Sequence, residues 1–220
     1  MRWPLSRLRP RRSAAADAYR RGPRATAETP WREAAYAAVD LETTGLDPRR
    51  DEIISFASVP IDDGRVGVGR TRTAIVRPER MPAAETIRIH GLRQGDLADA
   101  PLLDEVLDLI LEALAGRVLV AHAAWVERGF LRTALRPAGL GVAEPMLDTT
   151  VLARHVLGGD GPGDGVRLTE AANRLGLPVH RPHHADGDAL TTAQLFLALV
   201  ARLEASGPQT VGSLARLSAR

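Results

Sequence analysis

The amino-acid sequence predicts a layered α/β fold built on one mixed β-sheet. Three short segments with strand character come first, and helices interleaved with further strands follow them. That order is typical of helices packed against a sheet. The chain has 220 residues, 45% of them hydrophobic, which suffices for one buried core and leaves little room for a second domain.

The strands are expected mainly in the first half of the chain. Residues 35–40 (AYAAVD) form a short apolar strand, and residues 51–78 have the pattern of a hairpin with a glycine-containing connection. Residues 117–122 (RVLVAH) have the apolar run of another buried strand.

A strongly amphipathic helix begins after Pro101 and ends at Gly116. One of its faces is aliphatic and consists of Leu103, Val106, Leu107, Ile110 and Leu114. Four more helices are expected, in WVERGFLRTAL, in LDTTVLARHVL with a cap near Asp148, in LTEAANRLGL and in DALTTAQLFLALVARLEA. The glycine-rich residues 158–165 (GGDGPGDG) are expected to form a flexible loop.

The net charge of +2 conceals an uneven distribution. Residues 1–24 carry eight arginines and one acid, a charge of +7, which leaves −5 for the rest of the chain. We therefore expect a basic, disordered leader (1–30), one catalytic-sized domain (31–205) and a short C-terminal extension (206–220). A basic arm can attract phosphates nonspecifically, but the leader equally fits a solubilising segment, a start codon placed too early or an organelle transit peptide.

The composition also excludes several kinds of chemistry. Because the chain has no cysteine, it can form neither a disulfide nor a thiolate zinc site, and it has no cysteine nucleophile. No apolar run approaches the ~20 residues of a membrane span, and the first residues lack the apolar core of a secretory signal. We therefore expect a cytoplasmic protein with no membrane partner.

Asp40 and Glu42 form the first chemical motif, in VDLETTGLDP. A strand points residues two apart to the same face, so both carboxylates can reach shared cations, which offset their repulsion. In the turn that follows, the backbone amides and the hydroxyls of Thr43 and Thr44 could hold a substrate end. The alternative is a strand end with two solvated acids.

The second motif is HHADGDAL, near the C-terminus. His183 and His184 precede a helix, and Asp188 lies in its first turn, where the helix dipole favours a carboxylate. A histidine beside a metal site can accept a proton from water at neutral pH. His184 would share a helical face with Asp188, whereas His183 would act from an extended lead-in. A surface loop capped by Asp186 or Asp188 is the alternative.

Five segments in order, VDLETTGLDP, IRIHGL, VAHAAWVERGFL, LDT and HHADGDAL, resemble the DnaQ-like 3′-to-5′ exonucleases of the DEDD superfamily, histidine subclass. This family includes the epsilon-type exonuclease domains of DNA polymerase III, and the resemblance covers residues 34–202. It implies an RNase H-like fold, in which helices flank a mixed sheet in three layers. It also implies hydrolysis of a 3′-terminal phosphodiester with two divalent cations, Mg²⁺ or Mn²⁺.

The resemblance also implies roles for individual residues. Asp40 would bridge both cations, and Glu42 and Asp188 would bind the one that holds the nucleophilic water. The family pattern of a histidine, four residues and an aspartate makes His183 the candidate general base. The residues expected near the terminal nucleotide are Thr43, Thr44, Leu46 and His90, although His90 fits a structural hydrogen bond equally well.

The middle motif departs from the family pattern H-N-A-x-F-D. Ala123 stands in place of the asparagine, Val126 in place of the phenylalanine and Glu127 in place of the metal-binding aspartate. Glutamate is one methylene longer and moves the carboxylate by up to ~1.5 Å, which a Mg²⁺ ion that keeps several waters can accommodate. We expect Glu127 to join the metal site, with Mn²⁺ as the ion to compare; the alternative is a surface acid.

Other residues near these motifs have simpler explanations. Trp125 and Phe130 are expected to pack in the core rather than to stack on bases, because aromatic residues near a helix start usually fill the core. Asp148 is expected to cap a helix, although its place in the family pattern also fits support of the site. His122 is expected to be structural or to support the residues of the site.

The predicted function is a metal-dependent 3′-to-5′ exonuclease that releases nucleoside 5′-monophosphates from single-stranded or frayed DNA, in replication or repair. Its partner would be a nucleic-acid 3′ end, DNA rather than RNA, with a DNA polymerase subunit as a further candidate. The alternatives are an exoribonuclease that trims RNA 3′ ends, and a non-catalytic nucleic-acid-binding module whose site has decayed.

Overall fold

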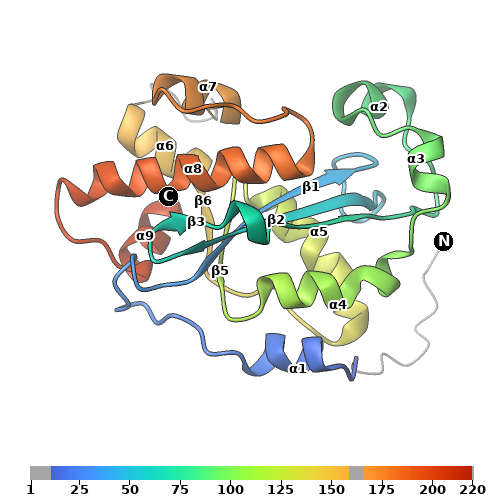
Figure 1. Ribbon diagram of the computed structural model, residues 1–220, viewed down its shortest axis with the longest axis horizontal. Helices are drawn as coiled ribbons and strands as arrows, with labels where there is room; N and C mark the ends of the chain where they lie inside the picture. Colours follow the sequence, from blue (N-terminus) through green and yellow to red (C-terminus); the bar gives the residue numbers. More distant parts are fainter. Residues whose placement is uncertain (1–10, 159–165, 220) are drawn as a thin grey trace.

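The computed structural model describes residues 11–158 and 166–219 and contains one mixed β-sheet (Figure 1). The strand order is β3-β2-β1-β5-β6, and β4 also pairs with β2. β1 is antiparallel to β2 and parallel to β5, and β5 is parallel to β6. The strands are β1 (Tyr36–Thr43), β2 (Ile53–Asp62), β3 (Arg65–Val66), β4 (Arg72–Ile75), β5 (Val118–Ala121) and β6 (Met146–Asp148).

Helices cover both faces of this sheet, so the described chain has three layers (Figure 1). The first core lies between the sheet and α1, α4 and α5, and the second lies between the sheet and α6 to α9. The helices are α1 (Ala14–Arg21), α2 (Ala84–His90), α3 (Gln94–Ala98), α4 (Leu103–Leu114), α5 (Trp125–Leu135), α6 (Thr149–Leu157), α7 (Leu168–Arg174), α8 (Ala185–Glu204) and α9 (Val211–Ser218), with short 3₁₀ turns η1 (Val68–Arg70) and η2 (Arg136–Ala138).

β1 is the central strand, and its alternation decides where the acids of the first motif point. Val39 and Leu41 belong to the core under α4 and α5, whereas Ala38 belongs to the core under α8. Successive side chains of a strand point to opposite faces. Asp40 and Glu42 therefore lie on the α8 side of the sheet, at the carboxyl end of the strand.

The predicted hairpin and the predicted amphipathic helix are both confirmed. β2 and β3 are joined by Asp63 and Gly64, both at positive φ (52° and 67°), as in the turns that suit the twist of a two-residue hairpin. In α4, the predicted aliphatic face is turned inward: Val106, Leu107, Ile110 and Leu114 are buried, and Leu103 is partly buried.

The structure differs from the expected disordered leader. Helix α1 begins after Ser13, whose side chain caps it, and packs on α4. Arg11 donates to the carboxylate of Asp108 at 2.7 Å. Tyr19 is buried; its hydroxyl donates to the carbonyl of Gly141 and accepts from the amide of Ala143, both at 2.9 Å.

The physical reason is that alanines and one tyrosine give α1 an apolar face, which the count of arginines hid. The arginines at the end of α1 lie near its C-terminus, where the helix dipole favours positive charge. Residues 1–10 lie outside the described residues, so disorder there stays a prediction.

The C-terminal segment also belongs to the folded body. α9 packs against α6 and β6, and its residues Val211 and Leu214 are buried in the second core. The boundaries predicted at residues 31 and 205 therefore do not separate folded from unfolded chain. The expected flexible loop lies outside the described residues, apart from Gly158. Within the described part of the chain, none of the helices combines the length and the apolar content that crossing a membrane requires.

Candidate metal and active site

Three acids from two distant segments meet at the carboxyl end of β1. Asp40 and Glu42 come from β1, and Asp188 comes from the first turn of α8. One carboxylate oxygen of each lies within 4.8 Å of the others, and no other group of this kind occurs among the residues described. That spacing allows the three side chains to share a divalent cation.

Glu127, in the first turn of α5, is the fourth acid of the site. Its side chain is 5% exposed, and its Oε2 atom has no hydrogen-bond partner among the described residues. Its charge raises the pKa of Asp40, and the charge of Glu42 raises the pKa of Glu127, although Glu127 is not among the acids whose oxygens lie within 4.8 Å of one another. The alternative of a surface acid is therefore wrong.

The carboxylates of the site are held in an environment that opposes their ionisation. Burial, and then the charges of Glu127, Glu42 and Asp188, raise the pKa of Asp40 well above its usual value. Burial and Asp188 raise the pKa of Glu42 to about 7. Burial, reinforced by Asp148 and Glu42, raises the pKa of Glu127 to about 8. A cluster of carboxylates that resists ionisation is the environment that a divalent cation stabilises.

Both histidines of the last motif flank Asp188. The backbone N–H of His183 donates to Asp188 Oδ2 at 2.8 Å, and His184 is the N-cap residue of α8. The charges of both imidazoles lower the pKa of Asp188, although burial outweighs them and raises it overall. His183 is exposed and has φ = 60°, so the extended lead-in expected for it is wrong: it lies in a left-handed turn.

Gly187 allows this turn to lie directly on α8, and it was not among the residues predicted to matter for the site. A Cβ atom at position 187 would lie 2.3 Å from the carbonyl oxygen of His180 and 2.6 Å from that of Arg181. The only sequence signal is a glycine in the first turn of a helix, where it weakens the helix without an evident benefit.

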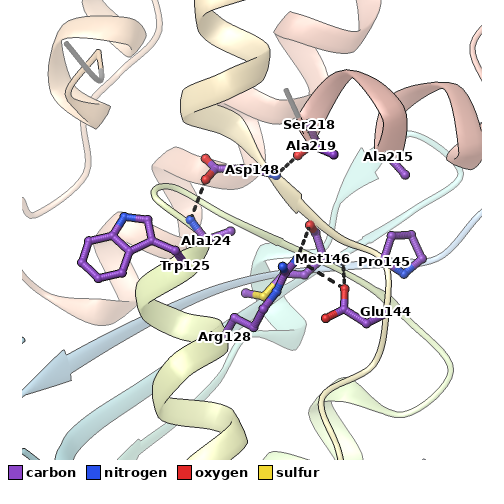
Figure 2. Close-up of a pocket in the computed structure, with 10 residues that line it drawn as sticks. All are labelled: Ala124, Trp125, Arg128, Glu144, Pro145, Met146, Asp148, Ala215, Ser218 and Ala219. Carbon is purple, nitrogen blue, oxygen red and sulfur yellow. Dashed lines mark hydrogen bonds and ion pairs between the residues drawn. The ribbon is translucent and has the colours of Figure 1, made fainter. Parts of the chain in front are cut away.

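Asp148 holds α5 in place, in addition to the capping role expected for it. It caps α6, as predicted, by accepting from the amide of Thr150 at 2.8 Å. The same carboxylate accepts from the amide of Ala124 at 2.9 Å (Figure 2) and from the amide of Ala123 at 3.2 Å. These bonds fix the turn that leads into α5, and hence the position of Glu127.

The far side of α5 is held by the turn after β1. A Cβ atom on Gly129 would lie 2.7 Å from the side chain of Pro48, so only glycine permits this approach. The hydroxyl of Thr133 donates to the carbonyl of Pro48 at 3.1 Å. The segments that carry Asp40 and Glu127 are thus fixed relative to each other.

Ala123 occupies a strained backbone conformation, with φ = 61°. Asparagine tolerates this left-handed region better than alanine does. Ala123→Asn should therefore stabilise the protein by ~0.5–1 kcal/mol, or about 1–4 °C in Tm, measured by thermal unfolding. Ala201→Asn, in the regular exposed part of α8, is the matched control and should destabilise. A lower Tm for Ala123→Asn would contradict the strain argument.

The residues expected to contact substrate are arranged around the turn after β1. The hydroxyl of Thr43 donates to the carbonyl of Gly45 at 2.6 Å, and that of Thr44 donates to Asp51 at 3.3 Å. Both hydroxyls therefore shape the turn, while Leu46 is 71% exposed beside it.

His90 is buried at the end of α2, where its Nδ1 atom accepts from the amide of Leu92 at 3.0 Å. Its Nε2 atom has no partner in the described chain. The structural hydrogen bond is therefore present, and the second ring nitrogen remains free to donate.

The two aromatic residues of α5 differ in burial. Phe130 is buried, as predicted, but Trp125 is 63% exposed, so the prediction that it packs in the core is wrong. At the start of the helix no element of the described chain covers the indole. His122 bonds to Thr149 Oγ1 at 3.0 Å and to the carbonyl of Val166 at 2.8 Å, in line with a structural role.

Comparison with known proteins places these features in a family. Residues 37–196 match the family described as Exonuclease (RNase_T). A "DNA polymerase III subunit epsilon-like protein" of Rhodobacter capsulatus is 38% identical over 199 residues, 89% of this chain and 28% of that protein. A "DNA polymerase III PolC-type" of Thermotoga petrophila is 34% identical over 82% of this chain and 13% of that protein. The chain thus spans about a quarter or less of the length of these relatives.

Solved structures share the fold. Exonuclease X, in complex with 5′ overhanging duplex DNA, superposes with a TM-score of 0.65 at 23% identity, over 83% of this chain and 99% of that one. E. coli Exonuclease I, with a dT13 oligonucleotide, gives 0.65 at 17% identity, over 79% of this chain and 42% of that one. The predicted RNase H-like α/β fold is confirmed, and with the family match over most of its length, the chain belongs to the RNase_T exonuclease family.

Proposed function

We propose that this chain is a metal-dependent 3′-to-5′ exonuclease that acts on single-stranded or frayed DNA ends and releases nucleoside 5′-monophosphates. The observation that carries the proposal is the convergence of Asp40, Glu42 and Asp188 within 4.8 Å, together with a buried Glu127 whose Oε2 atom has no partner among the described residues. A set of acids drawn from three separated motifs is suited to divalent cations and to little else.

Each residue has a distinct task in this proposal. Asp40, Glu42 and Asp188 hold the cations, with Glu127 as the fourth acid; bound Mg²⁺ or Mn²⁺ supplies the positive charge that stabilises the transition state of phosphodiester hydrolysis. His183 accepts the proton of the water that attacks phosphorus, while the bond to the 3′ oxygen breaks and that oxygen leaves with a proton. In this proposal, Leu46 and His90 contact the terminal nucleotide.

The homologues that carry polymerase names suggest a setting for this activity. The relatives named as epsilon-like and PolC-type DNA polymerase III proteins support DNA as the substrate and a DNA polymerase subunit as a partner. A cytoplasmic location is part of the same proposal.

The direct test uses 5′-labelled single-stranded DNA and RNA of one sequence, with Mg²⁺ or Mn²⁺. We expect a ladder of DNA products shortened from the 3′ end, faster than the RNA ladder. A phosphorothioate linkage at the 3′ terminus resists hydrolysis and should block the ladder, because the enzyme is expected to start at that end. This substrate therefore tests the direction of attack. If neither nucleic acid is shortened with either metal, the exonuclease proposal fails.

A paired substitution tests the general base. His183→Ala should lower kcat by ~10²–10⁴-fold, the usual contribution of a general base. His184→Ala is the matched control and should keep most of kcat. The opposite pattern would transfer the role to His184.

A further inference from the structure

Trp125 presents an uncovered indole at the start of the helix that carries Glu127. It is the first residue of α5, two residues before Glu127, and 63% of it is exposed. Aromatic side chains supply large amounts of buried area in cores and interfaces. One left in water at this end of α5 is therefore available to a ligand that reaches the helix start.

The indole is also held in a fixed place relative to the acids. Its neighbour Ala124 is buried, and the amide of Ala124 donates to Asp148 at 2.9 Å. Figure 2 shows the indole projecting from the first turn of α5 on the side opposite Arg128 and Glu144. The helix start is thus anchored, and the ring alone is free.

The charges around Trp125 favour an uncharged ligand group over a phosphate. Trp125 borders a hollow of about 410 Å³ that is also lined by Arg128, Glu144, Met146 and Asp148. Arg128 donates to the carbonyl of Met146 at 3.1 Å and pairs with Glu144 at 3.3 Å. Its charge is therefore largely neutralised, and the two acids repel phosphate oxygens. An aromatic face binds the face of a nucleobase regardless of its sequence.

We propose that Trp125 is a stacking platform for an unpaired base of the strand whose 3′ end occupies the acidic site. This inference rests on the proposed function, because it takes single-stranded nucleic acid as the ligand. Trp125 is then a positioning residue: it holds the strand by a base and leaves the hydrolysis itself to the acids and the histidine.

Binding without turnover tests this directly. A fluorescein-labelled oligothymidylate with 3′ phosphorothioate linkages is titrated in Ca²⁺ and followed by anisotropy. Trp125→Ala should weaken binding about tenfold, within the range found for loss of one base–aromatic stack. Trp125→Phe and Trp125→Tyr keep a ring and should bind nearly as well as the unmodified protein.

Three controls separate stacking from other effects. Val68→Ala removes an equally exposed apolar side chain from η1 (55% exposed) and should change nothing. An oligonucleotide of abasic residues should bind the unmodified protein and Trp125→Ala equally, because it has no base to stack. The dependence of affinity on salt should be the same for both proteins, because no phosphate contact is lost.

The inference is overturned if Trp125→Ala binds the oligothymidylate as tightly as the unmodified protein does. It is also overturned if Trp125→Ala loses the same affinity for the abasic strand. Failure of this inference can be told apart from failure of the proposed function. If affinity depends on Trp125 but the protein never shortens DNA, the exonuclease proposal fails and the stacking role of Trp125 stands. If the protein shortens DNA but Trp125 has no effect on binding, the stacking role fails and the exonuclease proposal stands.

Discussion

Asp40→Asn is expected to abolish hydrolysis and, at the same time, to stabilise the metal-free protein. The substitution removes the most strongly perturbed carboxylate of the site, whose pKa is raised by burial and by three neighbouring acids. Without metal, loss of that charge relieves repulsion in a buried cluster. With metal, it would remove the carboxylate proposed to bridge both cations.

The two effects are measured separately. We expect the rate of 3′ shortening to fall by ~10³-fold or more, since several kcal/mol of transition-state stabilisation depend on the cations. Thermal unfolding in EDTA at pH 8 should show a gain of ~1–2 kcal/mol, or about 2–8 °C in Tm. A variant that loses both activity and stability has been damaged in its fold and would contradict this account.

Asp62→Asn is the matched control on the neighbouring strand. Burial of Asp62 opposes its ionisation, but hydrogen bonds and charges from Arg117 and Arg70 outweigh it and lower its pKa. Arg117 donates to this carboxylate at 2.7 Å. Asp62→Asn should therefore destabilise the folded protein, while leaving the rate of hydrolysis nearly unchanged.

The metal-free protein should lose stability as the pH rises from about 6.5 to about 8, and Mg²⁺ or Mn²⁺ should restore it. In the unfolded chain the two glutamates titrate near their ordinary pKa of 4.5, whereas in the folded chain Glu42 holds its proton to about pH 7 and Glu127 to about pH 8. The folded state thus binds more protons in this range, and the free energy of unfolding falls as the pH rises.

The expected loss is on the order of 2 kcal/mol across this window, given about 1.4 kcal/mol per pH unit for each group that differs in protonation. Thermal unfolding in EDTA and in Mg²⁺, at matched pH values, measures it. The window begins at pH 6.5 because burial lowers the pKa of His90 and of His122, and below pH 6.5 those shifts give the opposite slope.

Glu127→Gln isolates the contribution of the buried glutamate. It cannot ionise, so the metal-free variant should show a clearly flatter decline between pH 6.5 and pH 8. A profile in EDTA that is flat for the unmodified protein would show that the acids are not forced together in solution, contrary to the structure.

The parts of the site that the sequence could predict are those governed by local periodicity. A spacing of two within a strand places Asp40 and Glu42 on one face whatever surrounds them, and Asp188 in a first helical turn follows from the helix pattern. That these segments meet came from the resemblance of their order to a family, because no local rule brings a residue of α8 to the end of β1.

The parts that the sequence missed depend on neighbours that lie far away in the chain. The fold of α1 depends on α4 and on the loop that bonds Tyr19, while the local arginines indicated disorder. Trp125 is exposed because nothing in the described chain covers the start of α5, which its apolar character could not reveal. Gly187 matters because any Cβ atom at its position would lie within 3 Å of the carbonyl oxygens of His180 and Arg181.

The hydrogen bonds of Asp148 make the position of Glu127 depend on β6, the shortest strand of the central path through the sheet apart from β3. β6 has only three residues, and within the described residues it pairs with β5 alone. Short edge strands open locally at a lower free energy than central strands. Because Asp148 ends β6 and anchors the turn before Glu127, each such opening would release the fourth acid while Asp40 and Glu42 stay in place on the central strand. Asp40 and Glu42 would then stay in position while Glu127 moves with each local opening of β6. Helix α9 would oppose that opening, because its Ser218 accepts from the amide of Asp148.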